Sequence, residues 1–193
     1  MSRIQYIFPG QLVAMIKAQE ILNKKFNGED WRKKMSLGMA KTAMLVEFAE
    51  AANEIQATWA WWKRDRTLDL SRAHVEFIDV LHFAMLIALY RNSEEQMIEA
   101  LYDEEPDMYG PVADPHNNFI KAITRFFTAV DQDNRKNIAV GLYNIINTGA
   151  LLYAMNPGEV FEVYRLKNER NHERVDGGIL EGKYDKSKES DLL

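Results

Sequence analysis

The segment LVEFAEAA (residues 45–52) places two glutamates three positions apart within an otherwise apolar run. A second segment, VEFIDVL (residues 75–81), repeats the pattern with a glutamate and an aspartate. Side chains three residues apart project from the same side of a helix, so each acidic pair can point at one place. The two segments therefore predict two long helices that each present carboxylates to the interior. The four acids are Glu47, Glu50, Glu76 and Asp79.

Two such pairs on neighbouring helices, whose axes lie roughly 8–10 Å apart, would surround one centre with four carboxylates. Like charges in a medium of low dielectric repel, so this arrangement needs a counter-charge. All-oxygen ligands favour Mg2+, Ca2+ or Mn2+ over zinc. A di-iron centre needs a Glu-x-x-His motif on each of two helices, and it is disfavoured because the residue three before His82 is Asp79 and not a glutamate. The alternative interpretation is that the acidic pairs lie on solvent-exposed helix faces and bind no metal. Glu54 lies seven residues after Glu47, and the spacing leaves open whether it is a further ligand.

Helical spacing also dominates outside these segments, while the period-two alternation of strands is nearly absent. We predict an all-α, compact multi-helix bundle with one domain over residues 1–180 and a mobile tail over residues 181–193. Capping signals at Ser71, at Ser93 and at Asp114 predict helix starts. The predicted helices cover about residues 11–25, 37–62, 71–90, a short stretch from 93, 115–130, 133–155, and a stretch after 158.

Composition excludes several classes of protein. The net charge of −5 gives no basic surface for nucleic acid, and the absence of cysteine excludes disulfides and thiolate chemistry. We expect a cytoplasmic protein without a signal peptide, since residues 1–10 lack a basic segment followed by an apolar run. Residues 138–155 carry no charge and approach the length of a membrane span, but they include two asparagines. We interpret them as a buried helix at a subunit interface, and we expect no membrane association.

The paired acids resemble the metal signature of the dimeric, all-α dUTPases, relatives of the MazG-like nucleotide pyrophosphohydrolases. Four further segments are similar to segments of this family. They are the part of the first helix with Gln19 and Asn23, WAWWK (residues 59–63), DVLHF (residues 79–83), and a motif of lysine, asparagines and arginine from Tyr164 to Arg174. The chain departs from the family pattern at the end of this motif, where Val175, Ile179 and Leu180 replace the usual residues.

The resemblance implies hydrolysis of dUTP to dUMP and pyrophosphate by water that attacks the α-phosphate, with dUDP as a further candidate substrate. It implies two or three Mg2+ ions, replaceable by Mn2+, on the four acids, with Glu50 as the base that activates water and Glu47 as the second choice. It also implies a homodimer. The expected substrate-binding residues are Gln19, Asn23, Trp62, Lys63, His82 and Phe83 around the base and sugar, and Lys167, Asn168, Asn171, Arg174 and Lys183 around the phosphates.

Two alternatives stay open from the sequence. The same metal chemistry could serve another nucleotide, such as dCTP or a non-canonical triphosphate. The chain could also be a non-catalytic helical interaction module whose acids are solvated.

Overall fold

In the computed structural model, residues 4–104, 113–185, 187, 189 and 192–193 are described. Their regular structure consists of α-helices and short 3-10 helices, and no strand is found in these ranges, so the predicted all-α class is confirmed. Residues 105–112, most of the connection between the predicted helices that begin near residues 93 and 115, lie outside the described residues. The helices are α1 (Pro9–Asn27), α2 (Leu37–Glu54), α3 (Leu70–Arg91), α4 (Glu94–Asp103), α5 (Pro115–Asp131), α6 (Arg135–Leu152) and α7 (Glu159–Asp176), with 3-10 helices η1 (Trp31–Lys33), η2 (Gln56–Thr58) and η3 (Ile179–Glu181).

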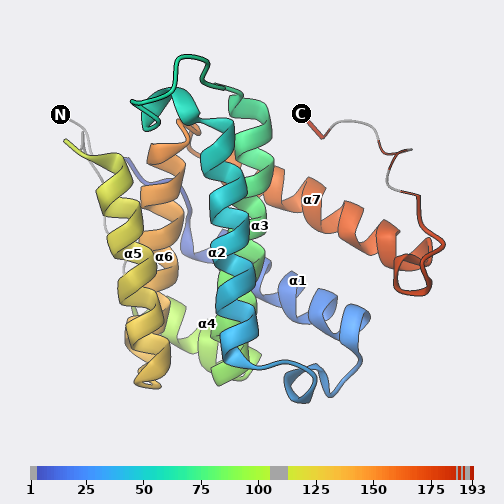
Figure 1. The fold of residues 1–193 in the computed structure, drawn as a ribbon. Helices are drawn as coiled ribbons and strands as arrows, with labels where there is room; N and C mark the ends of the chain where they lie inside the picture. The colour runs from blue at the N-terminus through green and yellow to red at the C-terminus, as the bar shows by residue number, and fades with distance from the viewer. Residues whose placement is uncertain (1–3, 105–112, 186, 188, 190–191) are drawn as a thin grey trace.

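Three helix pairs build the bundle (Figure 1). α2 packs along α3, and α5 packs along α6, so these pairs are formed by consecutive helices. The third pair joins α1 and α7, which lie side by side although they come from opposite ends of the sequence. Both α1 and α7 also contact α3. The two ends of the chain therefore flank the helix that carries the second acidic pair.

Two helix starts lie where the capping signals predicted them. Ser93 Oγ accepts the backbone N–H of Gln96, and the Gln96 side chain accepts the N–H of Ser93, which is a capping box for α4. The Asp114 carboxylate accepts the N–H of Asn117 at the start of α5. Short local patterns thus determine these boundaries.

The predicted cap of α3 was wrong. Ser71 lies inside the helix, and the carboxylate of Asp69 instead accepts the backbone N–H of Arg72 at 3.0 Å. Both residue types are good N-caps, so two candidates two positions apart are not distinguished by preference alone.

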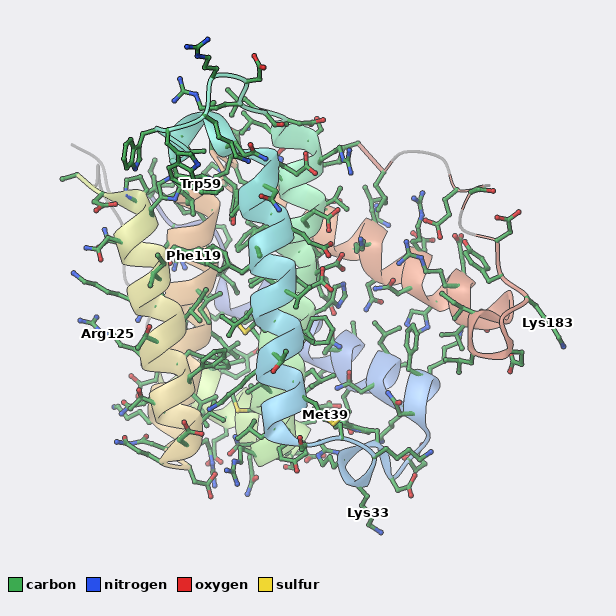
Figure 2. The ribbon with its side chains drawn as sticks, in the orientation of Figure 1. Lys33, Met39, Trp59, Phe119, Arg125 and Lys183 are labelled. Carbon is green, nitrogen blue, oxygen red and sulfur yellow. The ribbon has the colours of Figure 1, made fainter. Side chains whose placement is uncertain are left out.

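α2 ends at Glu54, well before the predicted end near residue 62. The chain then turns, and the N–H of Asp69 donates to the Glu54 carbonyl to close the loop between α2 and α3. The side chain of Trp59 folds back, and its indole N–H donates to the Ala52 carbonyl at 2.8 Å (Figure 2). The aromatic segment is therefore a loop at one end of the α2–α3 pair.

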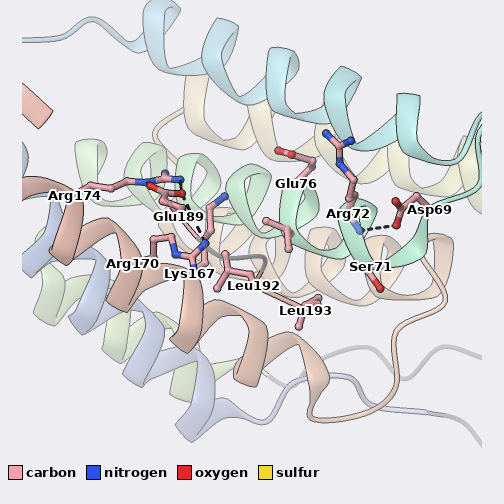
Figure 3. Close-up of a pocket in the computed structure, with 11 residues that line it drawn as sticks. Asp69, Ser71, Arg72, Glu76, Lys167, Arg170, Arg174, Glu189, Leu192 and Leu193 are labelled. Carbon is pink, nitrogen blue, oxygen red and sulfur yellow. Dashed lines mark hydrogen bonds and ion pairs between the residues drawn. The ribbon is translucent and has the colours of Figure 1, made fainter. Parts of the chain in front are cut away.

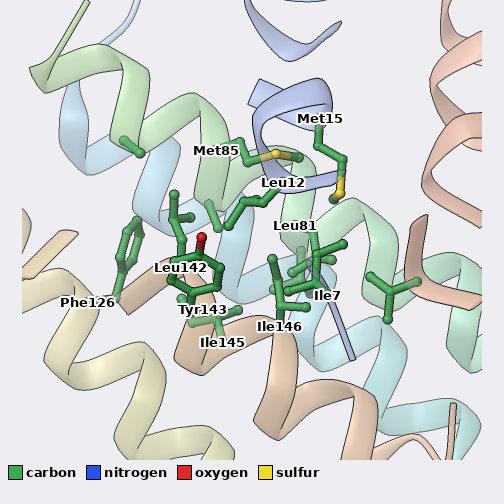
Figure 4. Close-up of a cluster of buried hydrophobic side chains, with 14 of the residues drawn as sticks. Ile7, Leu12, Met15, Leu81, Met85, Phe126, Leu142, Tyr143, Ile145 and Ile146 are labelled. Atoms are coloured by element: carbon green, nitrogen blue, oxygen red, sulfur yellow. The ribbon is translucent and has the colours of Figure 1, made fainter. Parts of the chain in front are cut away.

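α6 lies in the middle of the hydrophobic core. Its apolar residues pack against side chains from α1, α3 and α5 (Figure 4). The prediction of a buried helix is confirmed, but the predicted subunit interface is wrong, because these side chains are already buried within one chain. Members of this cluster are Leu12, Met15, Leu81, Met85, Phe126, Leu142, Tyr143, Ile145 and Ile146.

Gly149 allows α6 to approach two aromatic rings. A Cβ at this position would lie 2.9 Å from Cε2 of Phe119 and closer still to the ring of Phe77. The two rings pack edge to face with their centroids 5.8 Å apart. Because real Cβ atoms do not tolerate such contacts, the packing depends on the missing side chain.

α3 is long and apolar enough to match a membrane-spanning helix by length and composition alone. In this fold it is the central helix, and 67% of its most apolar window is buried inside the protein. Its apolar character is therefore accounted for by the core.

Candidate active site

Three of the four predicted metal ligands converge between α2 and α3. Glu47 and Glu50 from α2 and Glu76 from α3 each offer a carboxylate oxygen, and these oxygens all lie within 4.8 Å of one another. Glu50 is exposed, whereas the other two side chains are half-buried. The i, i+3 spacing on α2 thus directs two acids at a third on the neighbouring helix.

Asp79, the fourth predicted ligand, is held by a cation from α7. Its Oδ2 lies 2.7 Å from Nζ of Lys167, and the two side chains are only 19% and 7% exposed. A pair this close in a shielded place is a strong, charge-assisted hydrogen bond. Lys167, expected to hold phosphate, therefore also supplies counter-charge to the acidic cluster.

The electrostatics of the cluster disfavour full ionisation. Burial, followed by repulsion from Asp79, Glu50 and Glu76, raises the pKa of Glu47 to about 7. Burial also raises the pKa of Glu76 and that of Asp79, although the nearby Lys167 opposes both shifts. The acids therefore repel one another in the folded protein, and a divalent cation among them would relieve this repulsion.

A relay of three polar side chains lies beside the cluster. His82 Nδ1 is 2.7 Å from Gln19 Oε1, and Gln19 Nε2 donates to Asn23 Oδ1 at 2.8 Å. Because an amide oxygen only accepts, Nδ1 of His82 carries the proton and Nε2 presents a lone pair. Burial lowers the pKa of His82 to about 3, so the ring is neutral.

The relay ends in two buried atoms without partners among the described residues. These atoms are Nε2 of His82, which is an acceptor, and Nδ2 of Asn23, which is a donor. Buried polar atoms are rarely left unpaired, so an unpaired acceptor and an unpaired donor on residues that line the same cavity point to a polar ligand. His82 also packs against the ring of Tyr164, with centroids 4.8 Å apart, which fixes its orientation.

The cluster and the relay face one cavity of about 600 Å³. The cavity brings together most of the predicted site, and it also contains apolar residues that sequence reasoning missed. Leu22 and Phe26 follow Gln19 at helical spacing on α1, and this spacing was the signal for them. The predicted residues that line the cavity are Gln19, Asn23, Glu47, Glu50, Glu76, Asp79, His82, Phe83, Lys167, Asn171 and Arg174, and the additional ones are Leu22, Phe26, Asn27 and Leu86.

The tryptophan segment does not reach this cavity. Trp62 is 58% exposed and packs edge to face against Trp59, with ring centroids 5.5 Å apart. Lys63 Nζ donates to Oε1 of Gln56 at 3.0 Å on the same loop. Both predicted residues therefore lie outside the cavity, because α2 ends before them.

Two predicted phosphate ligands also lie elsewhere. Asn168 is buried, and its Nδ2 donates to the hydroxyl of Tyr164 within the α1–α7 contact. Lys183 is exposed beyond the end of α7 and points away from the bundle (Figure 2). Of the basic and amide residues that were expected to bind phosphate, Lys167, Asn171 and Arg174 line the cavity.

Glu54 is not part of the cluster. Its carboxylate forms an ion pair with Arg72 at 3.5 Å, and it does not line the cavity. Glu54, whose role the sequence left open, therefore links α2 to α3 through its ion pair with Arg72.

The donor set fits a hard divalent cation. Three carboxylates come within reach of one ion and a fourth lies beside them, while neutral His82 is hydrogen-bonded to Gln19. Mg2+ and Mn2+ take such oxygen ligands. These residues therefore suit the divalent cation that the sequence pattern predicts.

An all-α bundle that gathers acids from one helix pair, α2 and α3, next to cationic and amide donors has the site of a nucleotide hydrolase. The family model described as dUTPase matches residues 11–178, so this chain belongs to the dUTPase family, in its dimeric, all-α form. It is a dUTP diphosphatase of a family whose members depend on metal ions, and the MazG-like relationship is consistent with its fold. A search of curated proteins finds no match.

Proposed function

We propose that the protein hydrolyses dUTP to dUMP and pyrophosphate in a Mg2+-dependent reaction, within a catalytic domain that spans residues 1–180. The convergence of Glu47, Glu50 and Glu76 carries the proposal, because this cluster can bind a cation that a triphosphate also needs. Two or three Mg2+ ions, or Mn2+ in their place, fit the number of carboxylates.

In this mechanism the four acids would hold the metal, which would supply positive charge near the phosphates and would acidify water. Glu50, the most exposed of the three converging acids, orients the attacking water and accepts its proton, with Glu47 as the second candidate. The water oxygen bonds to the α-phosphorus as the bond to the bridging oxygen breaks and pyrophosphate leaves. Lys167 and Arg174 hold phosphate oxygens during this displacement.

The relay supports recognition of uracil. The N3–H of the base can donate to Nε2 of His82, and a neighbouring carbonyl oxygen can accept from Nδ2 of Asn23. A cytosine placed in the same pose has no proton on N3, so two lone pairs would face each other. Leaving such buried groups unpaired costs about 1–3 kcal/mol, enough to select between the two bases.

A nucleotide panel tests this function. We expect pyrophosphate release from dUTP only with Mg2+ or Mn2+, at a kcat/KM roughly 10²-fold above that for dCTP. Asn23→Leu should lower kcat/KM for dUTP by about 10- to 100-fold through the lost hydrogen bond, whereas the exposed Asn117→Leu should not change it. Assays with dUDP and non-canonical triphosphates complete the panel, and a preference for dCTP would contradict the proposal.

We also propose that the protein is a homodimer that associates through the outer face of α2. Met39 and Val46 are 63% and 49% exposed on this helix, and Leu45 is 46% exposed beside them. The stripe that they form continues through exposed, uncharged residues to Asn53. Because the stripe lies next to the acids of the same helix, a second copy could cover it and narrow the entrance to the cavity.

Substitution on this stripe should change the oligomeric state. Val46→Lys is expected to shift sedimentation or light scattering from dimer to monomer, because a charge would be buried at the centre of the interface. Ile120→Lys is a matched control, since Ile120 is 50% exposed on α5. A dimer that survives Val46→Lys, or a wild-type monomer, would place the interface elsewhere or remove it.

A further inference from the structure

The C-terminal tail returns to the site along α7. Residues 177–182 form a turn in which Gly178 and Gly182 have φ values of 84° and 68°, and the N–H of Lys183 donates to the Gly178 carbonyl at 2.9 Å. Glycine adopts positive φ without steric cost, so it allows this tight reversal. The ring of Tyr184 then packs directly over Gly177, where a Cβ would clash with it.

Beyond the turn, Glu189 forms a two-pronged contact with Arg174. The Nε and Nη2 atoms of Arg174 each donate to a different oxygen of Glu189 at 2.8 Å. Nη1 of Arg170 lies 3.7 Å from the same carboxylate, and Tyr184 also hydrogen-bonds to it. The Glu189 and Arg174 side chains are only 14% and 18% exposed, so the contact is partly shielded from water.

This contact lies in a second cavity, of about 460 Å³, that adjoins the first one (Figure 3). Glu76, Lys167 and Arg174 line both cavities, so the two cavities meet beside the acidic cluster. It is also lined by Arg170 and by the tail residues Glu189, Leu192 and Leu193. A phosphate chain whose α-phosphate lies at the cluster would therefore extend toward the two arginines.

An arginine fork binds carboxylate and phosphate oxygens with the same paired geometry. In this structure a carboxylate of the same chain, that of Glu189, satisfies the fork of Arg174. A pyrophosphate group carries more negative charge and more acceptor oxygens than one carboxylate, so it competes effectively for the two guanidinium groups.

We propose that Arg170 and Arg174 bind the β- and γ-phosphates of the nucleotide, and that Glu189 occupies this subsite until the nucleotide displaces it. The inference rests on the proposed function, since it assigns the outer end of the same substrate. It adds Arg170 to the binding residues, and it makes the tail an internal competitor that weakens binding of substrate and of released pyrophosphate.

The competition predicts tighter binding when the tail contact is removed. We expect Glu189→Gln to bind inorganic pyrophosphate, in metal-free buffer with a chelator, about 3- to 10-fold more tightly than the wild type by calorimetry. Gly177→Ala should give a gain of similar size, because its Cβ displaces Tyr184 without a change in charge. Glu181→Gln, which removes the same charge from the same segment, should leave the affinity unchanged.

Further measurements distinguish a failure of the tail competition from a failure of the proposed dUTP hydrolysis, on which the inference rests. In the Glu189→Gln background, Arg170→Gln should weaken binding of pyrophosphate and of α,β-imido-dUTP several-fold, but not binding of dUMP. An unchanged pyrophosphate affinity in Glu189→Gln, or an equal gain in Glu181→Gln, would overturn the tail competition even if dUTP is hydrolysed. If the wild type does not hydrolyse dUTP, the proposed function fails regardless of the tail.

Discussion

Replacing Glu50 by glutamine is expected to lower kcat for dUTP by about 10³-fold, because the substitution removes a base and one charge of the metal cluster. The oxygens of Glu50, Glu47 and Glu76 lie within 4.8 Å of one another, so loss of one carboxylate is felt by the whole cluster. Asp79→Asn should cause a similar loss, since it also removes the partner of Lys167. Steady-state release of pyrophosphate at saturating Mg2+ measures both effects.

Glu54→Gln is the matched control for Glu50→Gln. It makes the same chemical change one turn later on α2, but Glu54 pairs with Arg72 outside the cavity. Its kcat should stay within about threefold of the wild type, and circular dichroism should show unchanged helix content in both variants. If Glu50→Gln keeps more than about a tenth of wild-type kcat, Glu50 is not the base and the role passes to Glu47.

Gly149→Ala is expected to cause the largest loss of stability among conservative changes. The added Cβ would overlap the rings of Phe77 and Phe119 on two neighbouring helices, so packed elements must move apart. Overpacking of this kind costs about 1–3 kcal/mol and sometimes more, and the higher helix propensity of alanine offsets less than about 1 kcal/mol of it. We expect a net loss of about 2 kcal/mol and a fall in Tm of roughly 4–8 °C.

Gly10→Ala provides the comparison for this effect. Gly10 lies in the first turn of α1, and a Cβ there would meet no heavy atom within 4 Å. Its Tm should therefore stay level or rise slightly, in agreement with helix propensity. An equal Tm for Gly149→Ala and the wild type in thermal denaturation would show that the two rings move aside at little cost.

Local patterns in the sequence predicted much of this fold. The capping box at Ser93 and the acidic pairs at i, i+3 depend only on residues within one turn, and the structure reproduces them. The end of α2 was missed because the loop is closed by a hydrogen bond from Asp69 to Glu54, and residues this far apart leave no periodic signal.

The site was predictable to a similar degree. Residues that lie on helices at regular spacing, such as Gln19 and Asn23, line the cavity as expected. The pairing of Lys167 with Asp79 depends on how α7 packs against α3, which no local pattern encodes. Trp62 lies outside the cavity for the same reason, because its position follows from the loop.

The pairing of α1 with α7 has a consequence for biosynthesis. Residues of α2 and α3 emerge from the ribosome long before Lys167, so the nascent chain carries the acids before it carries the cation that pairs with Asp79. Domains generally fold as units during synthesis, and this one cannot assemble its catalytic centre until the last helix docks. Chains cut short before residue 159 lack Lys167, Asn171 and Arg174, and we therefore expect them to be inactive toward dUTP.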